Sequence, residues 1–222
     1  MSGFLGLVSI GQTPRPDYEA AFRTYAPNAD IRVAGALDEM SAQSVSALAE
    51  KPGDYPLLTR LSDGSHVEID LSLLAPIVER KAQALASSGA SLVVVMCAGA
   101  FPEIRCGTPV LLPGKVIPAV VGALTQTRRI GIVTPVREQA PAAESKWRSD
   151  GFEPSVSWAA PHDPREMRRA AQEMSGTGLE LVVLDCMGHD ESYRTDFAEL
   201  CGRPTLLAQS LVARIAGEWA GQ

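Results

Sequence analysis

The sequence lacks the signals that would place it in a membrane or in an oxidising compartment. No apolar run reaches the roughly 18 residues that a membrane-spanning helix needs. No basic segment precedes the first apolar stretch, as it would in a signal peptide. The four cysteines show no paired spacing, which indicates reduced thiols and not a disulfide framework. We therefore expect a cytoplasmic protein with no membrane partner.

Motifs for metals, cofactors and nucleic acids are missing as well. There is no CxxC and no HExxH, the three histidines are scattered, and Gly3, Gly6 and Gly11 lack the GxGxxG spacing of a dinucleotide site. The formal net charge is −6 and no basic stripe is present, which argues against nucleic acid as a partner. We therefore predict a small-molecule ligand, no metal and no cofactor.

Apolar strands and helical segments alternate along all 222 residues. This pattern is typical of βαβ units and predicts an α/β fold with a mainly parallel sheet flanked by helices. Strands are predicted at residues 4–10, 31–34, 91–97, 109–112, 129–135, 155–158, 181–186 and 205–206, with a hairpin at 57–69. Helices are predicted at residues 17–25, 41–50, 71–87, 116–125, 138–149, 163–174 and 209–219, with one more between 186 and 205.

A short repeat indicates that the chain is doubled. Gly6-Leu-Val-Ser9 matches Gly131-Ile-Val-Thr134, and a proline follows each motif, at Pro14 and Pro135. Each motif lies on the first predicted strand of its half. We therefore predict two similar α/β lobes, at residues 1–114 and 115–208, and a terminal helix at 209–222 that packs back on the first lobe.

Two cysteines fall in matching places in these halves. Cys97 follows the apolar run that begins at Ser91, and Cys186 follows the run that begins at Leu181. Each run is short, continuous and rich in valine, as in a fully buried parallel strand. Open α/β sheets bind their ligands at the carboxyl ends of such strands. One thiol in each half suggests an acid and a base that act on opposite faces of a substrate. The alternative is that both are small buried hydrophobic residues, as free cysteines often are.

Four segments resemble one known family, AroM, which is similar to the aspartate/glutamate racemase superfamily. They are the opening motif from Ile10 to Asp17, Glu144 to Trp147, Pro161 to Asp163, and Leu184 to Gly188. The resemblance implies two pseudo-symmetric lobes with the site in the cleft between them. It also implies that Cys97 and Cys186 are the catalytic pair, and it is compatible with a homodimer.

The residues after each cysteine differ from those of amino-acid racemases. That group usually has Asn-Thr after the first cysteine and Thr-His after the second. Here Ala98-Gly99 follows the first cysteine, and Met187-Gly188-His189 follows the second. The absent groups help to bind α-amino acids, so another substrate is expected, and the Cys-Met-Gly segment resembles hydantoin racemases more closely. We predict that these five residues contact a small carboxylate or a cyclic imide or ureide.

The turns after the two motif strands are the predicted anion sites. Gln12, Thr13 and Arg15 follow the first strand, and Thr134 and Pro135 follow its counterpart. Hydroxyls and backbone amides bind carboxylates, and arginine can bind one through two hydrogen bonds. The alternative for the first turn is a simple helix start with a solvated arginine. The alternative for Thr134 is a helix cap.

Three further residues have open roles. His189 either tunes the Cys186 thiol or is an exposed loop residue. His162 belongs to a Pro-His-Asp-Pro turn, for which a structural role is at least as well supported. Lys146 lies in a predicted helix beside Trp147, and we expect a solvated lysine rather than one that reaches the site.

These observations favour a cofactor-independent racemase or epimerase of a small carboxylated or hydantoin-like carbon acid. Cysteine suits this chemistry because its unperturbed pKa, about 8.5, lets neighbouring groups hold it as thiol or thiolate. One alternative is a cis–trans isomerase or decarboxylase, in which one cysteine attacks the substrate or protonates a carbanion. The other is a metabolite-binding protein that does not turn its ligand over.

Overall fold

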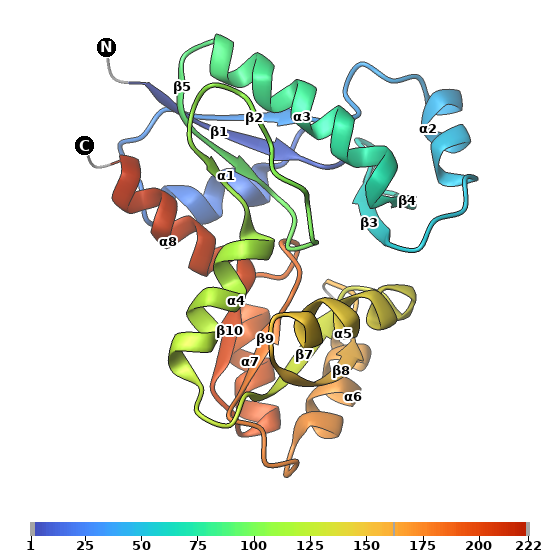
Figure 1. The fold of residues 1–222 in the computed structure, drawn as a ribbon, viewed down its shortest axis with the longest axis vertical. Helices are drawn as coiled ribbons and strands as arrows, with labels where there is room; N and C mark the ends of the chain where they lie inside the picture. Colours follow the sequence, from blue (N-terminus) through green and yellow to red (C-terminus); the bar gives the residue numbers. More distant parts are fainter. Residues whose placement is uncertain (1–2, 162, 221–222) are drawn as a thin grey trace. The chain divides into compact units, whose positions relative to one another are not determined.

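A computed structural model describes residues 3–161 and 163–220. The chain divides into two compact units, Met1–Pro113 with Val212–Gln222, and Gly114–Leu211. Each unit contains one parallel four-stranded sheet flanked by helices (Figure 1), which confirms the predicted α/β fold class. His162, which the sequence analysis places in a turn with an open role, lies outside the described residues.

The first unit is built on a sheet with the strand order β2-β1-β5-β6. Its strands are β1 (Phe4–Ser9), β2 (Ile31–Gly35), β5 (Ala90–Val95) and β6 (Val110–Leu111). Its helices are α1 (Pro16–Arg23), α2 (Ala42–Ala49) and α3 (Leu71–Ser87), and α3 packs against β1 and β5. The predicted hairpin consists of β3 (Pro56–Arg60) and β4 (His66–Asp70), and it turns at Gly64, whose φ of 86° suits glycine.

The second unit repeats this arrangement with the order β10-β9-β7-β8. Its strands are β7 (Arg129–Thr134), β8 (Glu153–Trp158), β9 (Leu181–Leu184) and β10 (Thr205–Leu207). Its helical segments are α4 (Pro113–Leu124), the 3₁₀ turn η1 (Arg137–Gln139), α5 (Ala140–Ser149), α6 (Pro164–Met174) and α7 (Glu191–Cys201). The final helix, α8 (Ala208–Ala220), begins in the second unit and ends in the first.

The two sheets have equivalent strand orders when one is read in reverse. The order β2-β1-β5-β6 corresponds to β8-β7-β9-β10, so the two motif strands, β1 and β7, occupy the same place. The strands that precede the cysteines, β5 and β9, also correspond, and each pairs in parallel with its motif strand. The doubling inferred from the short repeat is therefore present in the fold.

The ends of several elements differ from the prediction. β5 ends at Val95 and β9 at Leu184, so each cysteine lies two residues beyond its strand and not at the strand end. The ladder continues for one bond after each strand, from the Met96 amide to Val8 and from the Asp185 amide to Val133. The helix predicted from residue 138 begins as the turn η1, and α5 follows with a proline in its first turn.

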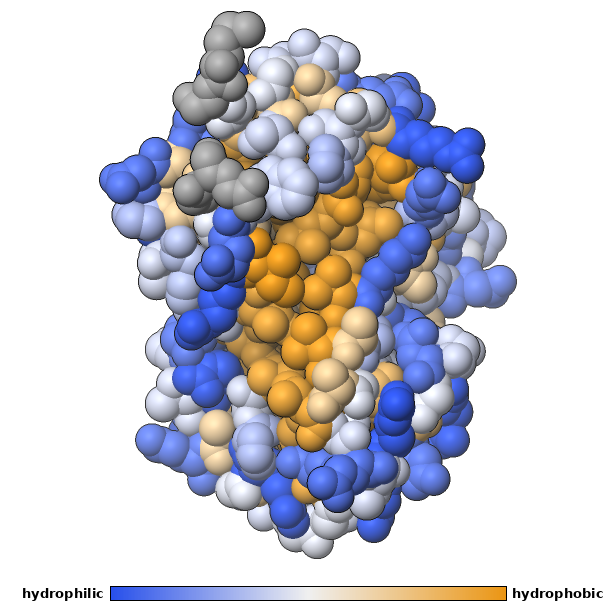
Figure 2. Space-filling model, turned by 60° about the vertical axis from the view of Figure 1, so that its left-hand side comes forward, coloured by the Kyte–Doolittle hydropathy of each residue, from blue (hydrophilic) through white to orange (hydrophobic). Residues whose placement is uncertain are grey.

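Large apolar side chains also reach the surface. Leu124 on α4, Leu200 on α7 and Trp219 on α8 are exposed. Figure 2 shows apolar residues, coloured orange, among the hydrophilic residues of the surface. In the part of the chain that the structure describes, no helix has both the length and the apolar character needed to cross a membrane.

Candidate functional site

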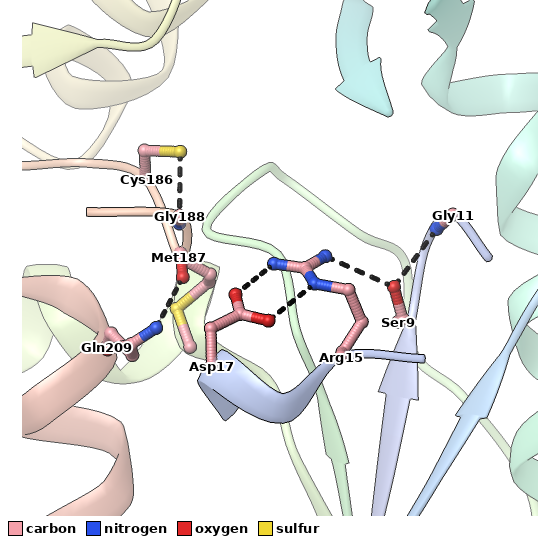
Figure 3. A network of polar contacts seen from close by, with 8 residues as sticks. All are labelled: Ser9, Gly11, Arg15, Asp17, Cys186, Met187, Gly188 and Gln209. Carbon is pink, nitrogen blue, oxygen red and sulfur yellow. Dashed lines mark hydrogen bonds and ion pairs between the residues drawn. The ribbon is translucent and has the colours of Figure 1, made fainter. Parts of the chain in front are cut away.

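The two cysteines make the same local contact in their separate units. The Gly99 amide donates to the Cys97 sulfur at 3.4 Å, and the Gly188 amide donates to the Cys186 sulfur at 3.3 Å (Figure 3 shows the latter). Both cysteines are half-buried. A hydrogen bond to sulfur favours the thiolate over the thiol. The two loops are therefore built alike to stabilise a charged sulfur at the carboxyl edge of a parallel sheet.

Glycine at the second position after each cysteine keeps the amide close to sulfur. A Cβ on Gly99 would lie 3.2 Å from Leu57 Cδ2 and 3.3 Å from the Cys97 sulfur. A Cβ on Gly188 would lie 3.1 Å from Pro161 Cγ and 3.5 Å from the Cys186 sulfur. At 3.1 to 3.3 Å the neighbouring atoms would have to shift by a few tenths of an ångström, so alanine at either position would crowd the loop beside its cysteine.

We expect Gly188→Ala to reduce the reactivity of Cys186 about five- to tenfold, because it weakens one hydrogen bond to the thiolate. The measurement is the rate of iodoacetamide alkylation at Cys186, followed by peptide mass spectrometry. Gly122→Ala is the control, since a Cβ there would first meet the mobile end of Arg128, at 3.2 Å. Equal rates in parent and Gly188→Ala would show that the amide contact does not tune the thiol.

A buried glutamine anchors the loop after Cys186. The Gln209 side chain donates to the Met187 carbonyl at 2.8 Å (Figure 3), and both residues are buried. Ala98, at the corresponding place after Cys97, is also buried. The Gln209 contact cannot be predicted from the sequence, because the two partners are 22 residues apart and no motif links them.

Arg15 belongs to a buried network and is not solvated. Its Nε and Nη2 donate to the two Asp17 carboxylate oxygens at 2.9 and 2.6 Å, and its guanidinium lies 3.5 Å over the Tyr18 ring. Its Nη1 is 3.5 Å from the Ser9 hydroxyl oxygen, which also accepts from the Gly11 amide (Figure 3). The two Arg15 donors that were predicted to bind a substrate carboxylate are therefore already bound to the Asp17 carboxylate.

The Arg15–Asp17 contact also sets the charge of the carboxyl group. Burial alone would raise the pKa of Asp17, but the hydrogen bonds and positive charge of Arg15 outweigh it, so this pKa is lowered. A carboxyl group whose pKa is lower in the folded state contributes stability above its unfolded pKa, about 3.9. That contribution is lost as the pH falls through the folded value.

We expect Arg15→Met to cost about 1 kcal/mol at neutral pH, since Asp17 is partly exposed and solvent screens the pair. The same variant should show a smaller loss of stability than the parent as the pH falls from about 5 to 3. Urea unfolding at several pH values measures both effects. Arg23→Met, in the last turn of α1, is the control. Parallel pH curves for parent and Arg15→Met would contradict the linkage.

The donors of Gln12 and Thr13 are also bound within the chain. The Thr13 amide and hydroxyl donate to the Asp38 carboxylate at 2.8 and 3.0 Å. The Gln12 side chain donates to the Leu37 carbonyl at 3.1 Å and accepts from the Ser62 amide at 3.0 Å. In this structure both residues brace the turn after β1, and an internal carboxylate lies at the predicted anion site.

The corresponding turn in the second unit has a different hydrogen-bond pattern. Thr134 and Pro135 are buried, and the Thr134 hydroxyl donates to the Val136 carbonyl at 2.9 Å. Its oxygen is also 3.4 Å from the Ser157 carbonyl. The hydroxyl hydrogen is directed at backbone oxygens, so Thr134 shapes the turn that follows β7.

A buried ion pair lies directly before Cys186. The Asp185 carboxylate accepts from Trp147 Nε1 at 2.9 Å, and the same oxygen is 3.6 Å from Lys146 Nζ. The Asp185 and Lys146 side chains are each 6% exposed. The expectation of a solvated Lys146 is therefore wrong. Helix α5 turns this lysine toward the end of β9, where the aspartate compensates its charge.

His189 is fully buried after the Cys186 loop and is not an exposed loop residue. Its Nε2 lies 3.0 Å from the Ala159 carbonyl, and because a carbonyl only accepts, Nε2 carries the hydrogen. The imidazole stacks on the Tyr193 ring with 4.4 Å between centroids. His189 thus fixes the loop that carries Gly188.

No group of three or more histidine, cysteine, aspartate or glutamate side chains that could hold a metal ion is found in residues 3–161 and 163–220. The chemistry available within each unit is that of a thiol beside a backbone amide, at the edge of a parallel sheet. Such a group can exchange a proton with a weak acid near neutral pH.

Comparison with known proteins agrees with the fold. The model of the family described as AroM protein matches residues 5–220. No curated protein matches the chain in sequence.

Solved structures resemble the chain over nearly its whole length. Maleate isomerase from Pseudomonas putida S16 superposes with a TM-score of 0.66 at 14% identity, covering 98% of this chain and 92% of that one. Allantoin racemase from Klebsiella pneumoniae gives 0.66 at 13% identity, with coverage of 99% and 88%. Unliganded arylmalonate decarboxylase gives 0.62 at 14% identity, with coverage of 99% and 93%. At such identities the likeness establishes a shared fold.

Proposed function

This chain belongs to the AroM family, and we propose that it is a cofactor-independent racemase or epimerase in which Cys97 and Cys186 carry the proton. One observation supports this proposal above the others: the sulfur–amide contact recurs at equivalent strands of the two units. A purely structural role for one cysteine would not account for a second cysteine with the same contact in the corresponding loop.

The proposed reaction inverts one carbon centre next to a carbonyl or carboxyl group. One sulfur, as thiolate, removes the proton from one face, and the electron pair of the broken C–H bond moves toward the neighbouring oxygen. The other sulfur, as thiol, returns a proton to the opposite face and becomes a thiolate. The two cysteines thus exchange protonation states in each turnover. This proposal requires that the two sulfurs address opposite faces of the same carbon.

The proposed substrate is a small carboxylate or a cyclic imide or ureide. Ala98-Gly99 and Met187-Gly188 supply backbone amides and no side-chain donor, which suits a ligand other than an α-amino acid. Arg15 and Thr13 already bind the internal carboxylates of Asp17 and Asp38. Because these donors are occupied, the first turn is better suited to a neutral cyclic ligand than to a free carboxylate. The likeness to an allantoin racemase supports the same choice.

A decarboxylase or cis–trans isomerase is the second candidate. It is favoured by the likeness to arylmalonate decarboxylase and maleate isomerase. Such a reaction would need one cysteine to protonate or attack the substrate and the other only to assist. A non-catalytic metabolite-binding protein is the third candidate, and the homodimer remains a prediction.

Exchange of substrate hydrogen for deuterium in deuterated water tests the proposed function. A panel of chiral hydantoins and chiral carboxylates is incubated with the protein, and incorporation is followed at the carbon centre by NMR. Exchange with inversion supports the racemase, and release of carbon dioxide or change of a double bond supports the second candidate. Binding without exchange on any member of the panel would contradict both enzymatic proposals and favour the third.

A further inference from the structure

Tyr193 has a feature that the proposed chemistry does not use. It lies in the first turn of α7, where its amide donates to the capping Asp190 side chain at 2.8 Å. Its ring is 6% exposed and stacks on His189. The hydroxyl is shielded from water and has no hydrogen-bond partner within the described ranges, 3–161 and 163–220. Buried hydroxyls are normally hydrogen-bonded, so this one calls for an explanation.

The charges around the hydroxyl keep it protonated. Burial raises the pKa of Tyr193, and the negative charges of Glu166, Cys186 and Asp163 raise it further. The positive charge of Arg169 acts in the opposite direction and is the weakest of these influences. Tyr193 is therefore a neutral hydrogen-bond donor at every physiological pH, and it lies near enough to Cys186 to be influenced by its charge.

We propose that Tyr193 is a catalytic residue of the Cys186 half-site whose hydroxyl donates to the substrate oxygen that becomes negative when the carbon acid loses its proton. This inference rests on the proposed function and deepens it. A sulfur base takes the proton, the C–H electron pair forms a C=C bond, and the carbonyl pair moves onto oxygen. Tyr193 gives that oxygen a hydrogen bond and keeps its own proton.

The environment of the hydroxyl suits this role. A donor that is already oriented and shielded from water stabilises a developing charge more strongly than a solvated one. The stacked His189 ring, itself held by the Ala159 carbonyl, fixes the tyrosine ring. Because the Tyr193 hydroxyl has no hydrogen-bond partner among the residues that the structure describes, a hydrogen bond to substrate breaks none within that part of the chain.

The first test uses turnover. Tyr193→Phe keeps the ring and its stack but removes the donor, and should lower kcat for hydrogen–deuterium exchange about 10²- to 10³-fold with little change in KM. The alkylation rate of Cys186 should stay within about twofold of the parent, which would show that the loop is intact. Tyr25→Phe, in the first unit, is the control. Unchanged kcat in Tyr193→Phe on a compound that the parent exchanges would overturn this assignment and leave the proposed function standing.

The second test needs no turnover. Uracil, a flat cyclic ureide, imitates the planar carbanion, and its saturated counterpart, 5,6-dihydrouracil, imitates the tetrahedral ground state. Uracil should protect Cys186 from iodoacetamide at a concentration about tenfold lower in the parent than in Tyr193→Phe, while 5,6-dihydrouracil should show no such difference. Tyrosine-dependent protection in a parent that exchanges no carbon acid would support the donor and refute the proposed catalysis. Equal protection in both proteins, or none in the parent, would overturn the donor.

Discussion

Replacing either Cys97 or Cys186 with alanine is expected to reduce inversion of the substrate by at least about 10³-fold. In each single variant one face of the carbon lacks its proton carrier, and general acid–base groups of this kind contribute about 10²- to 10⁴-fold. Exchange at a single face should survive in each variant, because the remaining sulfur can still remove and return a proton. The two variants should therefore retain exchange with opposite enantiomers.

The measurement is exchange into each pure enantiomer in deuterated water, followed by chiral separation. Cys106→Ala and Cys201→Ala are matched controls. The Cys106 sulfur donates to the Thr108 carbonyl at 3.5 Å and packs against the core of the first unit, and Cys201 is buried at the end of α7 among core residues. A near-parental rate in Cys97→Ala would instead support the one-cysteine reaction of a decarboxylase. Loss of both exchange activities in each single variant would contradict two independent proton carriers.

The sequence predicted the fold because the fold depends on local patterns. Continuous apolar runs at β1, β5, β7 and β9 indicate buried parallel strands, and the segments between them have helical periodicity. The repeat of a glycine, two apolar residues and a hydroxyl then identified β1 and β7 as counterparts. Their neighbours in the two sheets follow from the same doubling. Strand ends were less predictable, because they depend on where a loop leaves the ladder.

The side-chain partners of the candidate site could not be predicted in the same way. Asp38 binds Thr13 across 25 residues, and Asp185 binds Trp147 across 38. Tertiary packing brings such partners together, and their separation along the sequence does not predict it. Arg15 and Asp17 are only two residues apart. The sequence of this segment is nevertheless compatible with a solvated arginine as well as with a buried ion pair, so it does not distinguish between them. Tyr193 belongs to no motif. Its hydroxyl is buried and has no hydrogen-bond partner within residues 3–161 and 163–220, which can be seen only in the folded chain.

The buried pair beside Cys186 leads to the largest expected effect on stability. Asp185→Asn keeps the shape of the side chain and an oxygen for Trp147, but it removes the carboxylate charge that lies 3.6 Å from the buried Lys146 Nζ. Breaking one side of a buried pair typically costs about 3–5 kcal/mol, and an exposed pair about 0–1 kcal/mol. We therefore expect the free energy of unfolding of Asp185→Asn to fall by about 3 kcal/mol.

Removing the lysine charge as well should restore much of that loss. In the double variant with Lys146→Met and Asp185→Asn, both charges of this pair are removed, and methionine has a length similar to that of the lysine stem. Urea unfolding of the parent, both single variants and the double variant forms a double-mutant cycle that isolates the pair. Glu144→Ala, which breaks the exposed pair with Arg148, is the control. Purely additive losses would show that the two charges do not depend on each other. Asp185 would then act only through its hydrogen bond to Trp147, and the end of β9 would owe its position to packing alone.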